Sequence, residues 1–152
     1  MMQRKRSMSV RDRMSRRVTT VRPEARLSEA AQLMRTGKIR HLPVVDRAGR
    51  LVGMVTDRDL RQALFAPAVQ AETEDVRSIL ETLSVGDIMT RGVVSVRAAT
   101  SIQDAARLMH ERKLGALPVV ERERLIGLLI ETDVLGAFQE LLGPARAAAS
   151  SP

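Results

Sequence analysis

The sequence contains no cysteine, tryptophan or tyrosine, and its only aromatic residues are Phe65 and Phe138. The absence of cysteine excludes disulfides, thiolate metal sites and cysteine nucleophiles. The two histidines, His41 and His110, could form a zinc site only together with carboxylates. With so few aromatic side chains, a surface that stacks the bases of single-stranded nucleic acid is also not expected.

Long apolar stretches and catalytic motifs are missing as well. The longest apolar run, 125–130, is far shorter than the roughly 20 residues that cross a bilayer. No apolar segment follows the basic N-terminus, as it would in a signal peptide, so we expect a cytoplasmic protein without membrane association. No G-x-S-x-G, P-loop or G-x-G-x-x-G motif occurs, and we therefore expect no enzyme activity. Hydrophobic residues still make up 44% of the chain, enough for a packed core.

Acidic residues are scarce in one region only. The net charge is +7, and residues 1–20 hold seven basic residues and one acidic residue, which leaves 18 basic and 17 acidic residues elsewhere. A basic arm of this kind can bind nucleic acid by releasing counterions. It can equally be a solvated terminus, which is the interpretation we favour, so nucleic acid remains an alternative partner.

The chain is a tandem duplication. When it is shifted by 75 residues, 10–60 aligns with 85–134 with one deletion opposite Gly49, and 21 of 50 aligned positions are identical. We expect a basic tail at 1–9, a first repeat at 10–66, a linker at 67–84, a second repeat at 85–142 and a loose tail at 143–152. In the linker, the spacing of Val76, Ile79, Leu80 and Leu83 predicts an amphipathic helix.

Each repeat has the pattern βαββα. The first predicts strands at 18–21, 42–45 and 51–55, and the second predicts strands at 93–96, 117–120 and 125–130. One helix follows the first strand of each repeat and another closes the repeat. The spacing Thr100-x-x-Gln103 resembles a capping box for the second repeat's first helix. The matched methionines, Met14 and Met89, are expected to pack in the core.

Three features repeat together: an LPVV strand, a glycine entering the following strand, and an aspartate (Asp59, Asp133) in the first turn of the closing helix. This combination resembles a tandem pair of cystathionine β-synthase (CBS) domains, also called a Bateman module, of the stand-alone bacterial type. The resemblance implies an α/β (α+β) fold in which two βαββα repeats pack as a pseudo-twofold disc. It also implies a regulatory homodimer whose clefts bind AMP, ADP, ATP or S-adenosylmethionine and which acts on an effector protein. A dimeric scaffold with empty clefts is a further alternative.

The start of the first closing helix is a candidate ligand site. With Thr56 as N-cap, Asp59 falls at the third helical position, and Arg58 lies between them. A helix N-terminus attracts phosphate, and the threonine hydroxyl adds a donor. The resemblance implies that Asp59 accepts hydrogen bonds from the ribose hydroxyls. The same two residues also form an ordinary capping box, which needs no ligand.

The second repeat departs from this pattern. Asp133 matches Asp59, but Ile130 replaces Thr56, and Thr132 could supply a hydroxyl only from a shifted position. Basic residues, Arg40 and His41, precede the first LPVV strand and resemble the phosphate-contacting pair of nucleotide-sensing members. Gly115 and Ala116 take their places in the second repeat. The sequence leaves open which of the two clefts Arg40 and His41 serve.

An adenine ring would need an apolar slot with a few polar groups. The candidates that complete our predicted ligand-binding set are Thr20, Ile39, Pro43, Ser95, Leu114 and Pro118. The closing helices offer apolar faces for a homodimer, through Leu60, Leu64, Val134, Leu135, Phe138 and Leu142. We expect no metal site and no required cofactor.

Overall fold

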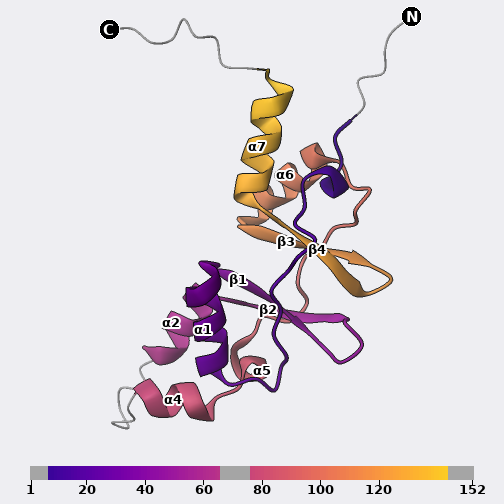
Figure 1. Ribbon diagram of the computed structural model, residues 1–152. Helices are drawn as coiled ribbons and strands as arrows, with labels where there is room; N and C mark the ends of the chain where they lie inside the picture. The colour runs from indigo at the N-terminus through magenta and orange to yellow at the C-terminus, as the bar shows by residue number, and fades with distance from the viewer. Residues whose placement is uncertain (1–6, 66–75, 144–152) are drawn as a thin grey trace, which may run out of the picture.

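The computed structural model describes residues 7–65 and 76–143 and consists of two lobes of the same design (Figure 1). Each lobe has one two-stranded antiparallel sheet with helices packed against it, so the expected mixed fold of two related units is confirmed. Lobe 1 contains α1 (Leu27–Gly37), β1 (His41–Val45), β2 (Leu51–Thr56), α2 (Asp57–Leu64), α4 (Val76–Thr82) and α5 (Val85–Ile88). Lobe 2 contains the 3-10 helix η1 (Val10–Asp12), α6 (Ile102–Arg112), β3 (Ala116–Glu121), β4 (Arg124–Ile130) and α7 (Glu131–Leu141).

The two hairpins form as the apolar runs predict. Leu42 of β1 lies opposite Val55 of β2, and Leu117 of β3 lies opposite Leu129 of β4; all four side chains are fully buried. Such runs of apolar residues are typical of strands covered on both faces.

The strands predicted at 18–21 and 93–96 are wrong in extent. Only Val21 and Val96 pair with the sheets, each through a single parallel bridge, to Val44 and Val119 respectively. The rest of each segment is extended chain that leaves the sheet, because it crosses from one lobe to the other. A β-branched run therefore marks the place where the chain enters the sheet but does not form a full strand.

The first helix of each repeat buries one face, as its periodicity predicts. In α6 the hydroxyl of Ser101 accepts a hydrogen bond from the N–H of Asp104 (3.1 Å), so this helix begins one residue later than the Thr100-x-x-Gln103 spacing suggests. The hydroxyl of Thr100 instead accepts from the N–H of Arg97 (3.2 Å) in the preceding turn. The helix predicted in the linker is present as α4.

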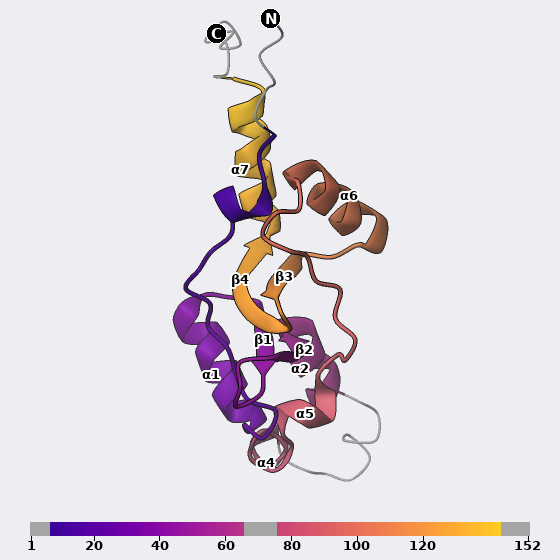
Figure 2. The same cartoon turned by 90° about the vertical axis from the view of Figure 1, so that its right-hand side faces the viewer.

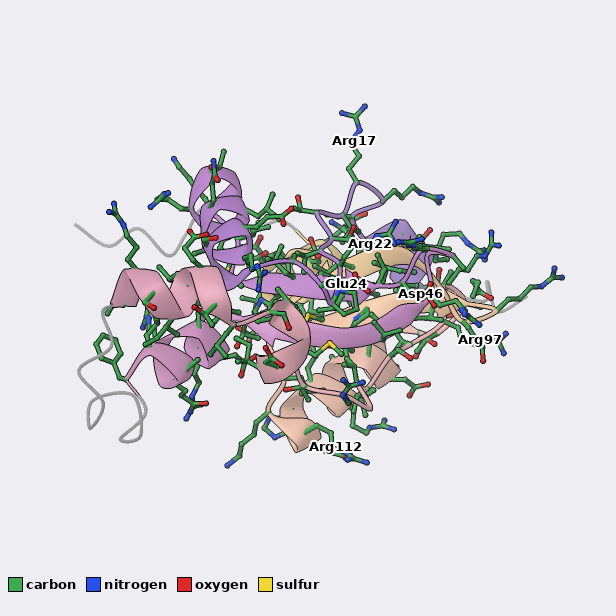
Figure 3. The ribbon with its side chains drawn as sticks, turned by 90° about the horizontal axis from the view of Figure 1, so that it is seen from below. Arg17, Arg22, Glu24, Asp46, Arg97 and Arg112 are labelled. Atoms are coloured by element: carbon green, nitrogen blue, oxygen red, sulfur yellow. The ribbon has the colours of Figure 1, made fainter. Side chains whose placement is uncertain are left out.

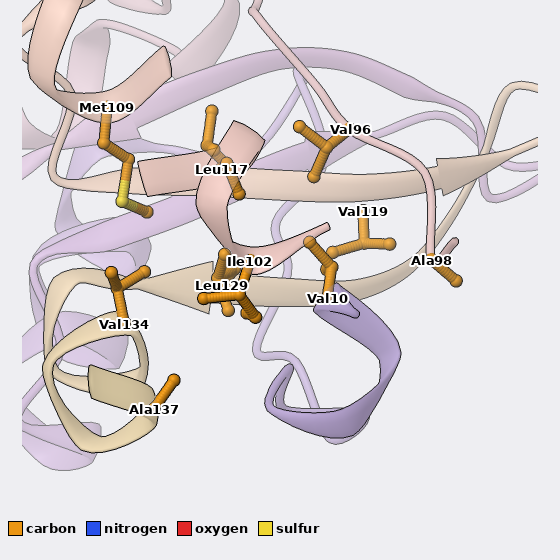
Figure 4. Close-up of a cluster of buried hydrophobic side chains, with 11 residues drawn as sticks. Val10, Val96, Ala98, Ile102, Met109, Leu117, Val119, Leu129, Val134 and Ala137 are labelled. Atoms are coloured by element: carbon orange, nitrogen blue, oxygen red, sulfur yellow. The ribbon is translucent and has the colours of Figure 1, made fainter. Parts of the chain in front are cut away.

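Each lobe is completed by a segment from the other repeat. Residues 8–15 pack against lobe 2: the N–H of Val10 donates to a backbone carbonyl there (2.8 Å), and Val10 is fully buried in that core. Residues 84–90 pack against lobe 1 in the same way through Val85, which is also fully buried. The repeats thus exchange their N-terminal segments. Figure 2 shows this segment beside α7, and Figure 4 shows Val10 among the buried side chains of lobe 2.

The exchange of segments explains why glycine stands at two matched positions of the sheets, each opposite a methionine of the exchanged segment. A Cβ at Gly53 would lie 2.6 Å from Sδ of Met89, and a Cβ at Gly127 would lie 2.7 Å from Sδ of Met14. Each methionine packs flat on the strand of the lobe that its segment completes. The prediction that these methionines pack is confirmed: Met89 belongs to the core of lobe 1, and Met14 is partly buried against the core of lobe 2. Glycine is needed opposite them for close approach.

Part of the basic N-terminal stretch belongs to lobe 2. Arg13 forms an ion pair with Glu140 of α7, and the carbonyl of Met8 accepts a hydrogen bond from the N–H of Ile102 (2.9 Å). Residues 1–6 lie outside the described part of the chain, as do 66–75 and 144–152. A truncation that probes the arm therefore has to stop before Met8.

The closing helices divide their apolar residues between core and surface. Leu60 and Val134, which were predicted to face a dimer partner, are 7% exposed and belong to the cores, because they lie on the sheet side of α2 and α7. Leu135 and Phe138 are exposed on α7, and Leu142 is exposed directly after it. In the described residues, no helix is long and apolar enough to cross a membrane, and no group of three or more potential metal ligands occurs.

Candidate functional site

A cavity of about 330 Å³ lies between the two lobes, and we call it the interlobe cleft. Lobe 1 supplies the segment that enters β1, and lobe 2 supplies the end of β4 and the start of α7. The connecting segment between the lobes, residues 15–19, forms a third wall. The lining residues are Ser15, Arg17, Val18, Thr19, Lys38, Ile39, Arg40, His41, Gly115, Leu128, Ile130, Glu131 and Thr132.

The lining of the interlobe cleft shows which lobe Arg40 and His41 face, which the sequence leaves open. Arg40 and His41 come from lobe 1, yet they line the same cavity as Ile130 and Thr132 at the start of α7 in lobe 2. The basic pair therefore lies beside the helix that carries Asp133. The two halves of this site come from different repeats, which is why one repeat's sequence does not reveal it.

Gly115 makes room for His41. A Cβ at Gly115 would lie 3.1 Å from Nε2 of His41 and 3.2 Å from its Cε1. The N–H of Glu131, at the start of α7, donates to the carbonyl of Gly115 (3.2 Å). The replacement of Arg40 by glycine at the matched position of the second repeat thus lets the imidazole reach across to lobe 2.

The aspartates at the starts of α2 and α7 are both used as caps. Thr56 and Asp59 form a reciprocal capping box, with the N–H of Thr56 donating to Oδ2 of Asp59 (2.9 Å) and the N–H of Asp59 donating to Oγ1 of Thr56 (3.1 Å). In α7 the N–H of Ile130 donates to Oδ2 of Asp133 (2.8 Å), but isoleucine has no acceptor to return the bond. The predicted N-cap at Thr56 is confirmed, and lobe 2 has half of the box.

The second carboxylate oxygen of each aspartate is not engaged by the cap. Among the hydrogen bonds of the described residues, Oδ1 of Asp59 and Oδ1 of Asp133 take part in none. Both side chains are half-buried. Capping and ligand binding therefore do not exclude each other at these positions, because one oxygen can hold the helix while the other accepts from a ligand.

The cleft is electropositive. Arg17, Lys38 and Arg40 line it with His41, against a single carboxylate, Glu131. Backbone N–H groups at the start of α7 add partial positive charge. Within the described residues, Arg17, Lys38 and Arg40 form no ion pair, so their charge is available to an anion.

His41 lies between the starts of α2 and α7. Burial lowers the pKa of this imidazole below its ordinary value, because the charged form is less well solvated. The carboxylates of Asp57, Glu131 and Asp59 act in the opposite direction, and the guanidinium of Arg40 adds to the lowering. Burial therefore favours the neutral imidazole of His41 in the free protein, and an anion in the cleft would favour its protonated form.

The structure brings together some of the predicted site residues but not others. Ile39, Arg40, His41 and Thr132 share the interlobe cleft. Thr19 lines it in place of Thr20, because neighbouring side chains of an extended segment point to opposite sides. Asp133 follows Thr132 at the start of α7 but does not itself line the cavity. The other predicted residues that do not line it are Pro43 and Pro118, fully buried in the sheets; Leu114, packed on the core of lobe 2; Ser95, in a separate hollow; and Thr56, Arg58 and Asp59 at α2.

Sequence reasoning missed three charged residues of the cleft: Arg17, Lys38 and Glu131. Lys38 is adjacent to the predicted group and has the left-handed backbone conformation (φ +52°) that ends α1. Arg17 is hidden in the basic N-terminal stretch. The arrangement as a whole, cations beside a helix N-terminus with apolar walls, suits a phosphate attached to an apolar ring.

The comparisons with known proteins agree with this architecture. A family model described as the CBS domain matches residues 10–66 and 85–140. A CBS domain-containing protein of Dictyostelium discoideum is 34% identical over 136 residues, which cover 89% of this chain and 94% of that protein. The solved structure of CBSX2 from Arabidopsis thaliana in complex with AMP is 33% identical, has a TM-score of 0.75, and is matched over 88% of this chain and 98% of its own.

A second solved structure holds a different ligand. It is the CBS domain pair of protein MJ0100 in complex with 5′-methylthioadenosine and S-adenosyl-L-methionine. It is 26% identical to this chain, has a TM-score of 0.75, and is matched over 89% of this chain and 98% of its own.

Proposed function

Because the chain belongs to the CBS domain family, we propose that it is a regulatory protein that binds an adenine nucleotide in the interlobe cleft and thereby changes its contacts with a partner protein. The observation that carries this proposal is the meeting of Arg40 and His41 from lobe 1 with the start of α7 from lobe 2. The AMP complex of CBSX2 supports a nucleotide, and the complex of MJ0100 keeps S-adenosylmethionine among the candidates.

Each wall of the cleft has a proposed role. Arg40, His41 and the backbone N–H groups at the start of α7 hold the phosphate, since a helix N-terminus and cations both attract it. Thr132 adds a hydroxyl. The free oxygen of Asp133 accepts hydrogen bonds from the ribose hydroxyls, and Ile39 is part of the apolar wall on which the adenine packs.

The start of α2 is a second, weaker candidate in this proposal. Thr56 supplies a hydroxyl and Asp59 a half-buried carboxylate, with Arg58 exposed between them. The positions matched to Arg40 and His41 are Gly115 and Ala116, so the second repeat contributes no basic pair there. A nucleotide at this end would have fewer cations for its phosphate and would bind less tightly.

A ligand in the interlobe cleft touches both lobes, so it can favour one arrangement of the lobes over another. It shifts this equilibrium only as far as its affinities for the two arrangements differ. We propose that the change is read by an effector protein in the cytoplasm, that the role is regulatory and not catalytic, and that a homodimer forms through the exposed apolar face of α7 (Leu135, Phe138 and Leu142).

The test is calorimetric titration of the full chain with adenosine, AMP, ADP, ATP and S-adenosylmethionine. We expect a phosphate-bearing nucleotide to bind more tightly than adenosine, and Asp133→Asn to weaken it about 10- to 100-fold, because hydrogen bonds to a charged acceptor contribute roughly 1.5–3 kcal/mol each. Asp59→Asn, the matched variant in lobe 1, should have a smaller effect. If none of these ligands binds, or if Asp133→Asn binds as well as the wild type, the assignment of this cleft is wrong.

A further inference from the structure

The turn ends of the hairpins carry a second charged surface, separate from the interlobe cleft. Each repeat places three arginines there at matched positions: Arg22, Arg47 and Arg50 in the first, and Arg97, Arg122 and Arg124 in the second. All six are exposed, and we call them the hairpin arginines. Figure 3 shows Arg22 and Arg97 on the same side of the molecule, with Asp46 between them.

The two hairpins touch at this surface. Arg50 and Arg124 face each other in an isolated antiparallel bridge, and the N–H of Leu51 donates to the carbonyl of Glu123 (3.1 Å). Like charges directly opposite on neighbouring strands are destabilising. Arginine nevertheless occupies both positions. A partner that brings negative charge to this point would remove the repulsion.

Most of the hairpin arginines have no acidic partner among the residues that the structure describes. Arg50 pairs with Asp46 (2.8 Å) and Arg97 pairs with Glu121 (3.6 Å). Within residues 7–65 and 76–143, the other four form no ion pair. Arg122 also has a left-handed backbone (φ +50°), a conformation that favours glycine or asparagine. The six arginines outnumber the carboxylates of the two turns: Asp46, Glu121 and Glu123.

A hollow of about 480 Å³ opens between the hairpins at this surface. Val52, Val93 and Val120 give it apolar walls, and its charged lining residues are Asp46, Arg50 and Glu123. It shares no lining residue with the interlobe cleft. A space of this kind suits an apolar side chain that enters from a partner, with the hairpin arginines around it.

We propose that the hairpin arginines and this hollow bind an acidic segment of a partner protein, with an apolar side chain of the segment in the hollow and its carboxylates on the arginines. The carboxylates interspersed among the arginines favour a protein segment over nucleic acid, because they would repel a continuous phosphate backbone. The inference shares with the proposed function only the premise of a protein partner. It does not require a nucleotide.

The experiment measures binding of a fluorescein-labelled, glutamate-rich peptide with one central leucine to the full chain, without nucleotide. Arg47→Gln combined with Arg122→Gln removes two unpaired charges at the turns, and we expect about three- to tenfold weaker binding. The matched control, Arg35→Gln with Arg112→Gln, removes the same charge from the last turns of α1 and α6 and should change binding less than about twofold.

Three further measurements make the result decisive. A peptide with glutamine in place of glutamate should not bind, and nucleotide titrations should be unchanged in both double variants, which separates this inference from the cleft. Equal loss in the two double variants would show attraction to net charge alone and overturn the proposal. A DNA duplex that binds more tightly than the peptide, and is weakened by Arg47→Gln/Arg122→Gln, would make the surface a nucleic-acid site and also overturn it.

Discussion

The two lobes share a scaffold and differ where they face each other. Leu42 and Leu117 occupy the same buried place in their sheets, and Gly53 and Gly127 both lie under a methionine from the exchanged segment. Around the cleft the equivalence ends. Lobe 1 contributes cations and lobe 2 contributes a helix N-terminus, so a pair of similar units makes one site from two different halves.

This difference shows how a duplicated chain can obtain an asymmetric site. The residues that hold each lobe together are constrained by packing and have stayed alike. Where the two lobes meet near the pseudo-twofold axis, a large side chain from one repeat needs a small residue opposite it in the other. His41 against Gly115 is such a pair.

The strongest test of the shared scaffold is truncation of its matched core residues. Leu42→Ala and Leu117→Ala each remove a fully buried side chain, and each should lower the free energy of unfolding by about 2–5 kcal/mol. Urea denaturation followed by circular dichroism measures both. Equivalent lobes predict losses within about 1 kcal/mol of each other, since the sites differ little in burial. A loss confined to one variant would contradict the equivalence.

The asymmetry of the cleft is tested by a double-mutant cycle. Arg40→Ala should weaken nucleotide binding by roughly 1.5–3 kcal/mol, because it removes a charged hydrogen-bond donor to phosphate. Combined with Asp133→Asn it should be non-additive, since both residues would hold one ligand, whereas with Asp59→Asn it should be additive. Calorimetry gives all the affinities. Coupling to Asp59 and not to Asp133 would reverse the assignment of the cleft.

The helix caps give a smaller difference between the lobes. Thr56→Ala removes the side-chain acceptor from the start of α2 and should cost about 1 kcal/mol of stability, while Thr56→Ser keeps the acceptor and should cost less. Lobe 2 has no equivalent bond to lose, because Ile130 lacks an acceptor. Thermal denaturation of the two variants, both without ligand, measures the effect. Equal losses for serine and alanine would exclude the hydroxyl as the cause.

The smallest expected effect is a pH dependence that only lobe 1 provides. The pKa of His41 is lowered by burial in the free protein, and a bound phosphate raises it again, so binding takes up a proton. Affinity should therefore rise as the pH falls from 8 to 6, by about two- to threefold more in the wild type than in His41→Gln. Protonation of the phosphate itself near pH 6 acts on both proteins alike. Identical pH profiles would remove His41 from the site.

Much of the fold is predictable because its signals are local. The apolar runs around Leu42 and Leu117 predict the hairpins, and the internal repeat predicts two units of one design. The exchange of residues 8–15 and 84–90 is not predictable in this way. It depends on contacts between distant parts of the chain, and either lobe offers a similar apolar surface to such a segment.

The candidate site also combines features that local sequence predicts with features that depend on contacts between the lobes. The cap at Thr56 follows from a four-residue spacing, and Arg40 and His41 stand out as basic residues before a buried strand. That they face lobe 2 depends on Gly115, which is informative only when both repeats are placed in space. The adenine candidates Pro43 and Pro118 are fully buried in their strands and do not line the interlobe cleft, which their sequence neighbourhood alone does not reveal.

The exchanged segments carry a consequence for how such a chain arose. A single repeat has no second unit of its own chain on which to bury its N-terminal segment, so it would have to bury it on another copy, as in a domain-swapped dimer. Joining two copies by a linker turns that encounter into an intramolecular one, with an effective concentration on the order of millimolar. In a fused chain the two halves no longer have to be identical. From that point Arg40 and His41 could diverge from Gly115 and Ala116.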